Sequence, residues 1–239
     1  MEIESPSDFF KQNNYIIIEN FMNEHMTHIC YEYVKNKTIW ADYINFAHKE
    51  EYKNIYIGQF DDPQALDAYS CYGDILFDTI LYQATGKMQE FTGLELAPQY
   101  SYFRLYQKDN VLKVHKDRPS CEISTTLCLG WDSSNVEDKN YNWPIYLKND
   151  NNNQIAAHLK PGDMLIYKGD KLEHWRDKYA GLNHAQVFLH YNDKNGKYGD
   201  QYLDGRNILI PEEAHANKFE YYDIGRAVIN NKISDTPNS

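Results

Sequence analysis

The sequence predicts an α+β fold that is mainly β, with an antiparallel barrel or jelly roll as its core. After Pro98, short β-branched or aromatic segments follow one another between turn residues, with no helical spacing between them. Before Pro98, two segments with helical spacing of apolar residues are mixed with strand-like sequence. The chain of 239 residues is long enough to bury a sizeable core.

We expect a single domain, 1–239, in three parts. Residues 1–97 would form a mixed α/β buttress that supports the core. Residues 98–193 would form the jelly roll itself. The polar, glycine-containing segment 194–239 would wrap the surface, with a short helix near 212–220.

The N-terminal part begins with a strand and a helix. Residues 15–21 are rich in β-branched side chains, which favours a strand. Asn23 is then placed to cap a helix whose apolar residues recur at helical spacing to about Lys37. A second helix is expected over 74–91, because apolar residues recur there with the same spacing and Gly93 supplies a stop.

The core part is predicted to consist of short strands. Residues 100–106 alternate between aromatic and other side chains, as in a strand with one buried face. Turn residues then separate the further expected strands at 111–117, 121–129, 144–147, 155–159, 164–167 and 186–191.

Composition argues against several classes of protein. The 24 basic and 35 acidic residues give a net charge of −11, so nucleic acid is not an expected partner. No apolar run approaches the length of a membrane span, and the acidic N-terminus does not resemble a signal peptide. The four cysteines show no paired spacing, so we expect reduced thiols and a cytoplasmic protein without a membrane partner. The sequence carries no feature that fixes the oligomeric state.

Three residues are candidate metal ligands. Residues two apart in a strand point to the same side, so His115 and Asp117 can converge on one ion. His174, which follows a turn and a strand, is available as the third ligand. Two histidines and one carboxylate form the facial triad of non-haem Fe(II) sites, which leaves open positions for other ligands. The sequence contains no nucleophile motif and no phosphate-binding motif that would indicate a different kind of site.

In this order and spacing, the segments around the triad resemble the 2-oxoglutarate- and Fe(II)-dependent oxygenases, especially the prolyl 4-hydroxylase-like branch. Tyr106 precedes His115 by nine residues, and His174 follows Asp117 by 57. The other matching segments are Arg104-Leu105-Tyr106, the strand at 121–130 that ends in Leu-Gly, the short strand at 143–147 and the turn and strand at 161–167.

The resemblance implies a double-stranded β-helix, or cupin-like, core in which His115, Asp117 and His174 hold Fe(II). It also implies 2-oxoglutarate and O2 as co-substrates, with ascorbate as an optional reductant. The implied reaction is hydroxylation of an unactivated C–H bond with release of succinate and CO2. The target would be a peptidyl or prolyl residue, or a small metabolite.

One position departs from the family pattern. Ten residues after the second histidine, where the family usually has an arginine or lysine for the far carboxylate of 2-oxoglutarate, this sequence has His184. Arg176, which would share the face of His174 in a strand, is the second candidate, and Arg118 is a third that we expect to pair with Glu122. Tyr106 is a further candidate contact.

Ser124 and Thr126 alternate into the same interior and are candidates for hydrogen bonds to the co-substrate. The absence of the usual basic residue keeps two alternatives open. One is a metal-dependent cupin enzyme that does not use 2-oxoglutarate. The other is a non-catalytic cupin-like module that binds a sugar or a protein partner.

Overall fold

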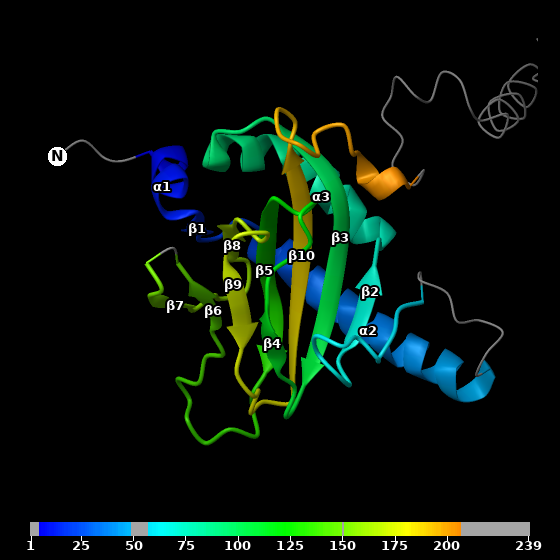
Figure 1. Ribbon diagram of the computed structural model, residues 1–239. Helices are drawn as coiled ribbons and strands as arrows, with labels where there is room; N and C mark the ends of the chain where they lie inside the picture. The colour runs from blue at the N-terminus through cyan, green and yellow to red at the C-terminus, as the bar shows by residue number, and fades with distance from the viewer. Residues whose placement is uncertain (1–4, 49–56, 150, 207–239) are drawn as a thin grey trace, which may run out of the picture. The chain divides into compact units, whose positions relative to one another are not determined.

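The computed structural model describes residues 5–48, 57–149 and 151–206 (Figure 1). The helices are α1 (Pro6–Asn13), α2 (Glu24–His48), α3 (Ile75–Thr92) and the 3-10 helix η1 (Leu203–Gly205). The strands are β1 (Tyr15–Ile18), β2 (Tyr69–Tyr72), β3 (Leu96–Gln107), β4 (Leu112–His115), β5 (Ile123–Asp132), β6 (Ile145–Lys148), β7 (Gln154–Ala157), β8 (Met164–Tyr167), β9 (Glu173–Arg176) and β10 (Asn183–Asp193).

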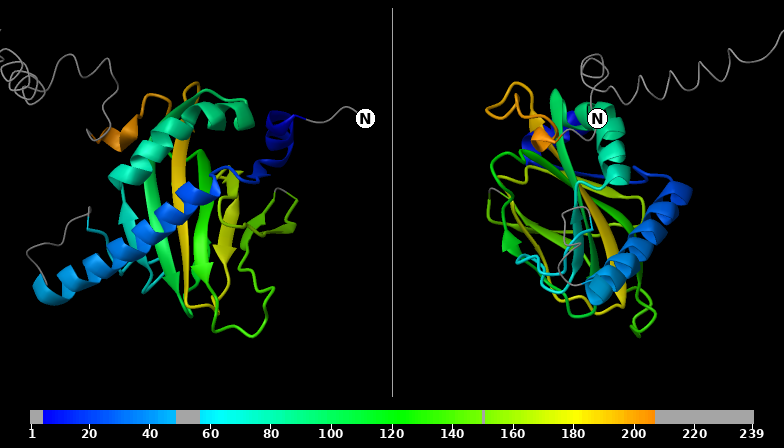
Figure 2. Two further views of the ribbon diagram at one scale, coloured as in Figure 1. Left: turned by 180° about the vertical axis from the view of Figure 1, so that it is seen from behind. Right: turned by 90° about the vertical axis from the view of Figure 1, so that its right-hand side faces the viewer.

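The strands form two antiparallel sheets. The larger has six strands in the order β1-β8-β5-β10-β3-β2, and the smaller has four in the order β4-β9-β6-β7. The two sheets face each other, while α2 and α3 cover the outer face of the larger one (Figure 2). This arrangement confirms the predicted mainly β, jelly-roll architecture.

Side chains of β3 alternate between two hydrophobic clusters, one on each face of the larger sheet. Phe103 and Leu105 pack outward into the cluster formed with α2 and α3. Tyr102 and Tyr106 point the other way, into a cluster between the sheets. Because side chains alternate along a strand, Arg104 lies on the same inner face as the two tyrosines.

Helix ends agree with the expected caps. The Asn23 side chain accepts a hydrogen bond from the backbone N–H of Met26 at 2.9 Å, and Asp74 caps α3 in the same way. Gly93 ends α3 with a φ of 68°, a conformation that glycine adopts without strain.

The predicted end of α2 at about Lys37 is wrong, because the helix continues to His48. Ala41 is buried and Ile44 still packs against the core, but Tyr43 and Phe46 are exposed. The C-terminal end of α2 extends past the edge of the larger sheet, so the apolar residues there do not mark a fully buried stripe (Figure 2).

The sequence did not predict α1, β2 or β9. The N-terminal part is also more than a buttress, because β1 pairs with β8 and β2 pairs with β3 to complete the larger sheet. The helix expected near 212–220 lies outside the described residues.

All four cysteines are buried and none forms a disulfide bond, as expected for reduced thiols. Among the described helices, none combines the length and the apolar character that crossing a bilayer requires.

Candidate metal centre

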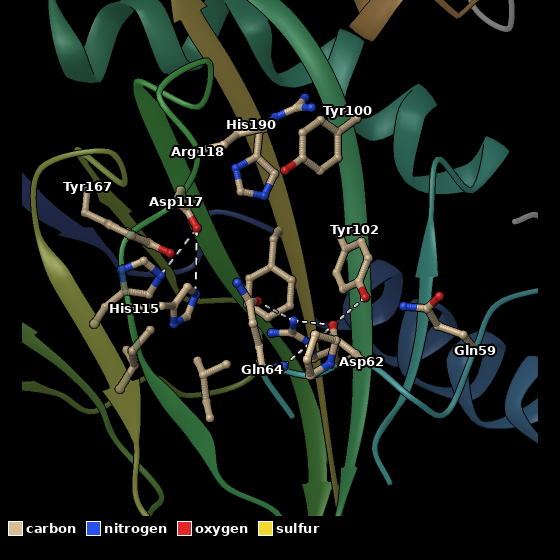
Figure 3. A pocket seen from close by; sticks show the side chains of 16 residues that line it. Gln59, Asp62, Gln64, Tyr100, Tyr102, His115, Asp117, Arg118, Tyr167 and His190 are labelled. Carbon is tan, nitrogen blue, oxygen red and sulfur yellow. Dashed lines mark hydrogen bonds and ion pairs between the residues drawn. The ribbon is translucent and has the colours of Figure 1, made fainter. Parts of the chain in front are cut away.

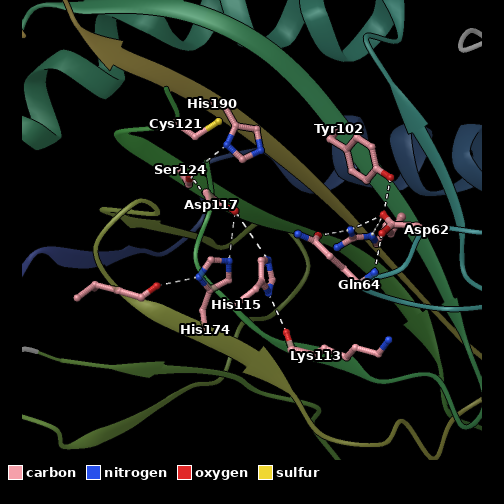
Figure 4. Close-up of polar contacts among 12 residues, drawn as sticks. Asp62, Gln64, Tyr102, Lys113, His115, Asp117, Cys121, Ser124, His174 and His190 are labelled. Atoms are coloured by element: carbon pink, nitrogen blue, oxygen red, sulfur yellow. Dashed lines mark hydrogen bonds and ion pairs between the residues drawn. The ribbon is translucent and has the colours of Figure 1, made fainter. Parts of the chain in front are cut away.

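The three predicted ligands come together at one end of the smaller sheet. β4 and β9 pair so that His115 lies opposite His174, and Asp117 follows β4 directly. The Oδ1 atom of Asp117 lies 3.8 Å from Nε2 of His115 and 3.6 Å from Nε2 of His174. One potential ligand atom from each residue lies within 4.8 Å of the others (Figure 4). The structure therefore brings together the two distant segments that the sequence singled out.

Backbone carbonyls orient both imidazoles. Nδ1 of His115 lies 2.8 Å from the carbonyl oxygen of Lys113, and Nδ1 of His174 lies 3.0 Å from that of Leu172. A carbonyl oxygen can only accept, so each Nδ1 carries a hydrogen, and Nε2 is the ring nitrogen that faces the centre. Such outer hydrogen bonds fix the ring orientation and tautomer that a metal ligand needs.

The ionisation states also suit a metal. Burial and the neighbouring His174 lower the pKa of His115 to about 4. Burial alone would raise the pKa of Asp117, but His174, His190 and Ser124 hold it well below its usual range. At neutral pH the site therefore offers a neutral imidazole and a charged carboxylate, the forms that bind divalent metals.

Two hydrogen bonds hold Asp117 in place. Its backbone N–H donates to the carbonyl oxygen of Gly169 at 2.9 Å. Its Oδ2 atom accepts a hydrogen bond of 2.5 Å from the Ser124 hydroxyl, which also lies 3.0 Å from Nδ1 of His190. Ser124, a predicted co-substrate contact, thus lies against the candidate metal ligand.

Gly169 leaves just enough room for this arrangement. A Cβ atom there would lie 2.1 Å from Oδ2 of Asp117 and 2.2 Å from the Ser124 hydroxyl oxygen. We expect Gly169→Ala to displace the carboxylate and to weaken Mn2+ binding by about 10-fold or more, measured by isothermal titration calorimetry. Gly86→Ala is the matched control, since a Cβ at that helical glycine meets nothing within 4 Å. Equal Mn2+ affinity in both variants would contradict the prediction.

The triad opens on a cavity of about 340 Å³ between the sheets (Figure 3). His115, Asp117 and His174 line one wall of this cavity. The other lining residues are polar or aromatic for the most part and include Gln59, Gln64, Tyr100, Tyr102, Arg104 and Phe188.

A buried ion pair fastens the segment 57–68 to β3 beside this cavity. The Oδ2 atom of Asp62 accepts bonds from Nη2 of Arg104 at 2.5 Å and from the Tyr102 hydroxyl at 2.6 Å. Burial alone would raise the pKa of Asp62, but Arg104 and Tyr102 lower it below 3.8. Both charged side chains are at most 8% exposed, so each depends on the other for compensation.

Asp62→Asn should therefore destabilise the protein by about 3 kcal/mol at neutral pH, because it leaves Arg104 buried without its counter-charge. Since the folded state lowers the pKa of Asp62, its contribution is complete above 3.8 and is lost as the pH falls through the folded value. Urea unfolding measured from neutral to acidic pH should show the unfolding free energies of Asp62→Asn and the wild type converging in acid. The exposed Asp61→Asn variant is the control. If the difference in unfolding free energy between Asp62→Asn and the wild type stays constant with pH, the prediction is wrong.

Arg176 lies two residues after His174 on the same inner face of β9 and is 1% exposed. Its Nη1 atom donates to the carbonyl oxygen of Trp143 at 2.7 Å, and the guanidinium lies over the Trp143 ring. Its Nε and Nη2 atoms are buried without a hydrogen-bond partner among the described residues. Burial lowers the pKa of Arg176, as expected for a cation without a carboxylate beside it.

His184 lies on β10 close to Arg176. Burial and the charge of Arg176 lower the pKa of His184 well below 6.5, so the imidazole is neutral. Its ring stacks on Trp131 with centroids 5.5 Å apart. Nε2 contacts the amide of Gln186, whose oxygen accepts a 2.8 Å bond from the Thr126 hydroxyl. Thr126 and His184 are thus joined through a glutamine.

Tyr106 is fully buried between the sheets, edge-on to Trp143. Its hydroxyl oxygen accepts a long bond of 3.4 Å from Nη1 of Arg104. Arg118, the third candidate cation, pairs with Asp204 at 2.6 Å rather than with the predicted partner Glu122. That partner was wrong because the segment after β10 returns to this side of β3, which the sequence did not indicate.

Three further residues of the site were not predicted from the sequence, namely Asp62, Gly169 and His190. His190 shares its inner face with His184 on β10, so strand alternation could have found it. No signal in the sequence pointed to Asp62.

No family model and no curated protein matches the sequence. Solved structures do match the fold. A prolyl-4-hydroxylase of Pseudomonas putida is 10% identical, with a TM-score of 0.56 over 78% of this chain and 96% of that one. SnoK, a non-haem α-ketoglutarate-dependent carbocyclase from nogalamycin biosynthesis, is 10% identical, with a TM-score of 0.58 over 81% and 85%. HygX from Streptomyces hygroscopicus, solved with nickel and 2-oxoglutarate, is 10% identical, with a TM-score of 0.52 over 77% and 85%.

These neighbours define the class of fold: the chain has the jelly-roll fold of the 2-oxoglutarate-dependent oxygenases. The neighbours themselves include a hydroxylase and a carbocyclase, so the shared fold leaves the reaction to be inferred from the site.

Proposed function

We propose that this protein is an Fe(II)- and 2-oxoglutarate-dependent dioxygenase that hydroxylates an unactivated C–H bond. The observation that carries the proposal is the convergence of two imidazole nitrogens and one carboxylate oxygen on the wall of a cavity. This donor set suits Fe(II) and leaves coordination positions open. Bound iron would supply the activation of O2, with succinate and CO2 as co-products.

Arg176, two residues after His174 on β9, offers a place for the far carboxylate of 2-oxoglutarate, although its side chain is not part of the lining of the cavity. Arg176 is a buried cation whose Nε and Nη2 atoms have no hydrogen-bond partner in the described part of the chain, and a carboxylate is the group that such a planar donor pair recognises best. We assign the far carboxylate to Arg176 for this reason. Its position on β9 would replace the basic residue that the family usually carries where this chain has His184.

The other residues predicted to contact the co-substrate have different roles in this proposal. Tyr106 accepts from Arg104, and among the described residues its own hydroxyl hydrogen has no acceptor, so it can donate to the co-substrate. The hydroxyls of Ser124 and Thr126 are engaged with Asp117 and Gln186. The neutral His184 supplies packing rather than charge.

The cavity suits a side chain of a peptide or a small polar metabolite. Its volume of about 340 Å³ lies at the lower end of the range for ligand pockets. Aromatic rings from Tyr100, Tyr102 and Phe188 and amides from Gln59 and Gln64 line it. We propose a peptidyl target first, by similarity to the prolyl hydroxylase branch, and a small metabolite second. The buried, unpaired cysteines agree with a cytoplasmic setting.

The test is to add Fe(II) and then 2-oxoglutarate to the protein without oxygen and to record visible absorption. A weak charge-transfer band that requires both additions supports the proposal. Metal binding without the band would favour a cupin enzyme that does not use 2-oxoglutarate. Failure to bind either one would favour a non-catalytic binding module.

A further inference from the structure

A row of side chains crosses the larger sheet and ends at the candidate metal ligand. His190 on β10 is paired directly with Tyr100 on β3 and with Ser124 on β5. The His190 ring stacks on Tyr100, with centroids 4.5 Å apart and planes 27° apart. The contacts thus run from Tyr100 on β3 to His190 on β10 (Figure 3), and from His190 through Ser124 on β5 to Asp117 (Figure 4).

Counting hydrogens along this row gives it a direction. The Ser124 hydroxyl has one hydrogen, which it donates to Oδ2 of Asp117. The Ser124 oxygen can therefore only accept from His190, so Nδ1 of His190 carries a hydrogen and donates it at 3.0 Å. Donation into Ser124 polarises its hydroxyl and strengthens the bond to the carboxylate.

The bond to Ser124 occupies one of the two carboxylate oxygens. Oδ2 is taken by the serine, while Oδ1 is the atom that lies near both imidazole nitrogens. A carboxylate held in this way reaches a metal through one oxygen and fills one coordination position. A free carboxylate can bind through both oxygens and fill two.

We propose that His190 is a positioning residue for the metal site: through Ser124 it reserves Oδ2 of Asp117 and leaves only Oδ1 for the metal. This inference rests on the proposed function, because it takes the triad to be a metal site. Its consequence is a site that keeps three positions open for co-substrate and O2.

Two isosteric variants of His190 separate positioning from packing. In His190→Asn, the amide nitrogen can occupy the place of Nδ1 and still donate to Ser124. In His190→Gln, the amide nitrogen reaches the place of Nε2 instead. Ser124→Ala removes the link altogether. Thr125→Val is the matched control, because it removes a buried hydroxyl from the same strand on the opposite face, where Thr125 accepts from the N–H of Leu189.

The probe is Co2+, whose visible spectrum reports coordination number, with affinity measured by titration. We expect Ser124→Ala and His190→Gln to bind Co2+ about 10- to 100-fold more weakly, with an altered spectrum. His190→Asn and Thr125→Val should stay within about threefold of the wild type, with an unchanged spectrum. Thermal melting by circular dichroism checks that each variant is folded.

The inference is overturned if Ser124→Ala and His190→Gln keep the affinity and the spectrum of the wild type. It is also overturned if His190→Asn loses as much as His190→Gln, since packing alone would then explain both. A wild-type protein that binds neither Co2+ nor Mn2+ would overturn the proposed function itself, which is a different and recognisable result.

Discussion

Asp117→Ala is expected to abolish the visible band with Fe(II) and 2-oxoglutarate and to weaken metal binding by about 100-fold or more. Among the described residues, Asp117 supplies the one carboxylate of the cluster with the two imidazoles. Changes in outer hydrogen-bond partners alone cost about 10- to 100-fold in metal affinity, so removal of a ligand should cost at least as much. The measurement is calorimetric titration with Mn2+, followed by the anaerobic spectrum.

Glu173→Ala is the control for this experiment. Glu173 neighbours His174 on β9, but its side chain is partly exposed and pairs with Lys148. It should bind Mn2+ as the wild type does. A band retained by Asp117→Ala would mean that another carboxylate completes the site.

Arg176→Met should leave metal binding intact and weaken 2-oxoglutarate binding by roughly 100-fold, or about 3 kcal/mol, since one partner of a buried charge pair is removed. The apo-protein should be as stable as the wild type or more so, because an unpaired buried cation is replaced by an apolar side chain. Accordingly, 2-oxoglutarate should raise the melting temperature of the wild type but not of the variant.

The rival cations provide the comparison. His184→Gln and Arg118→Met should change 2-oxoglutarate affinity far less than Arg176→Met, because His184 is neutral and Arg118 already pairs with Asp204. If either variant loses more 2-oxoglutarate affinity than Arg176→Met does, that residue and not Arg176 binds the far carboxylate.

Strand-like sequence and turn residues predicted the core strands apart from β2 and β9, and residue spacing pointed to the three candidate ligands. His115 and Asp117 are close in sequence, and the turn before β8 and the strand that follows it mark the approach to His174. The environment of Arg176 could not be predicted, because the guanidinium donates its one hydrogen bond among the described residues to the carbonyl oxygen of Trp143, 33 residues earlier in the chain. Asp62 was missed for the same reason, since it meets Arg104 only through the folding of segment 57–68.

Two strands of the sheets were not predicted from the sequence. β2 (Tyr69–Tyr72) and β9 (Glu173–Arg176) contain no β-branched residue, whereas the predicted strands β1, β6, β7 and β8, which are equally short, each contain isoleucine. Their place in the structure comes from pairing with neighbours, β3 in one case and β4 and β6 in the other.

The alternation of side chains along β9 links two parts of the site. His174 and Arg176 alternate with the half-buried Glu173 and Trp175, so a slip of one residue would turn both inner side chains outward together. A single-residue insertion or deletion between β8 and β9 that shifts the register of β9 would therefore turn both the second imidazole and the buried guanidinium away from the site. Neither side chain can change faces without the other.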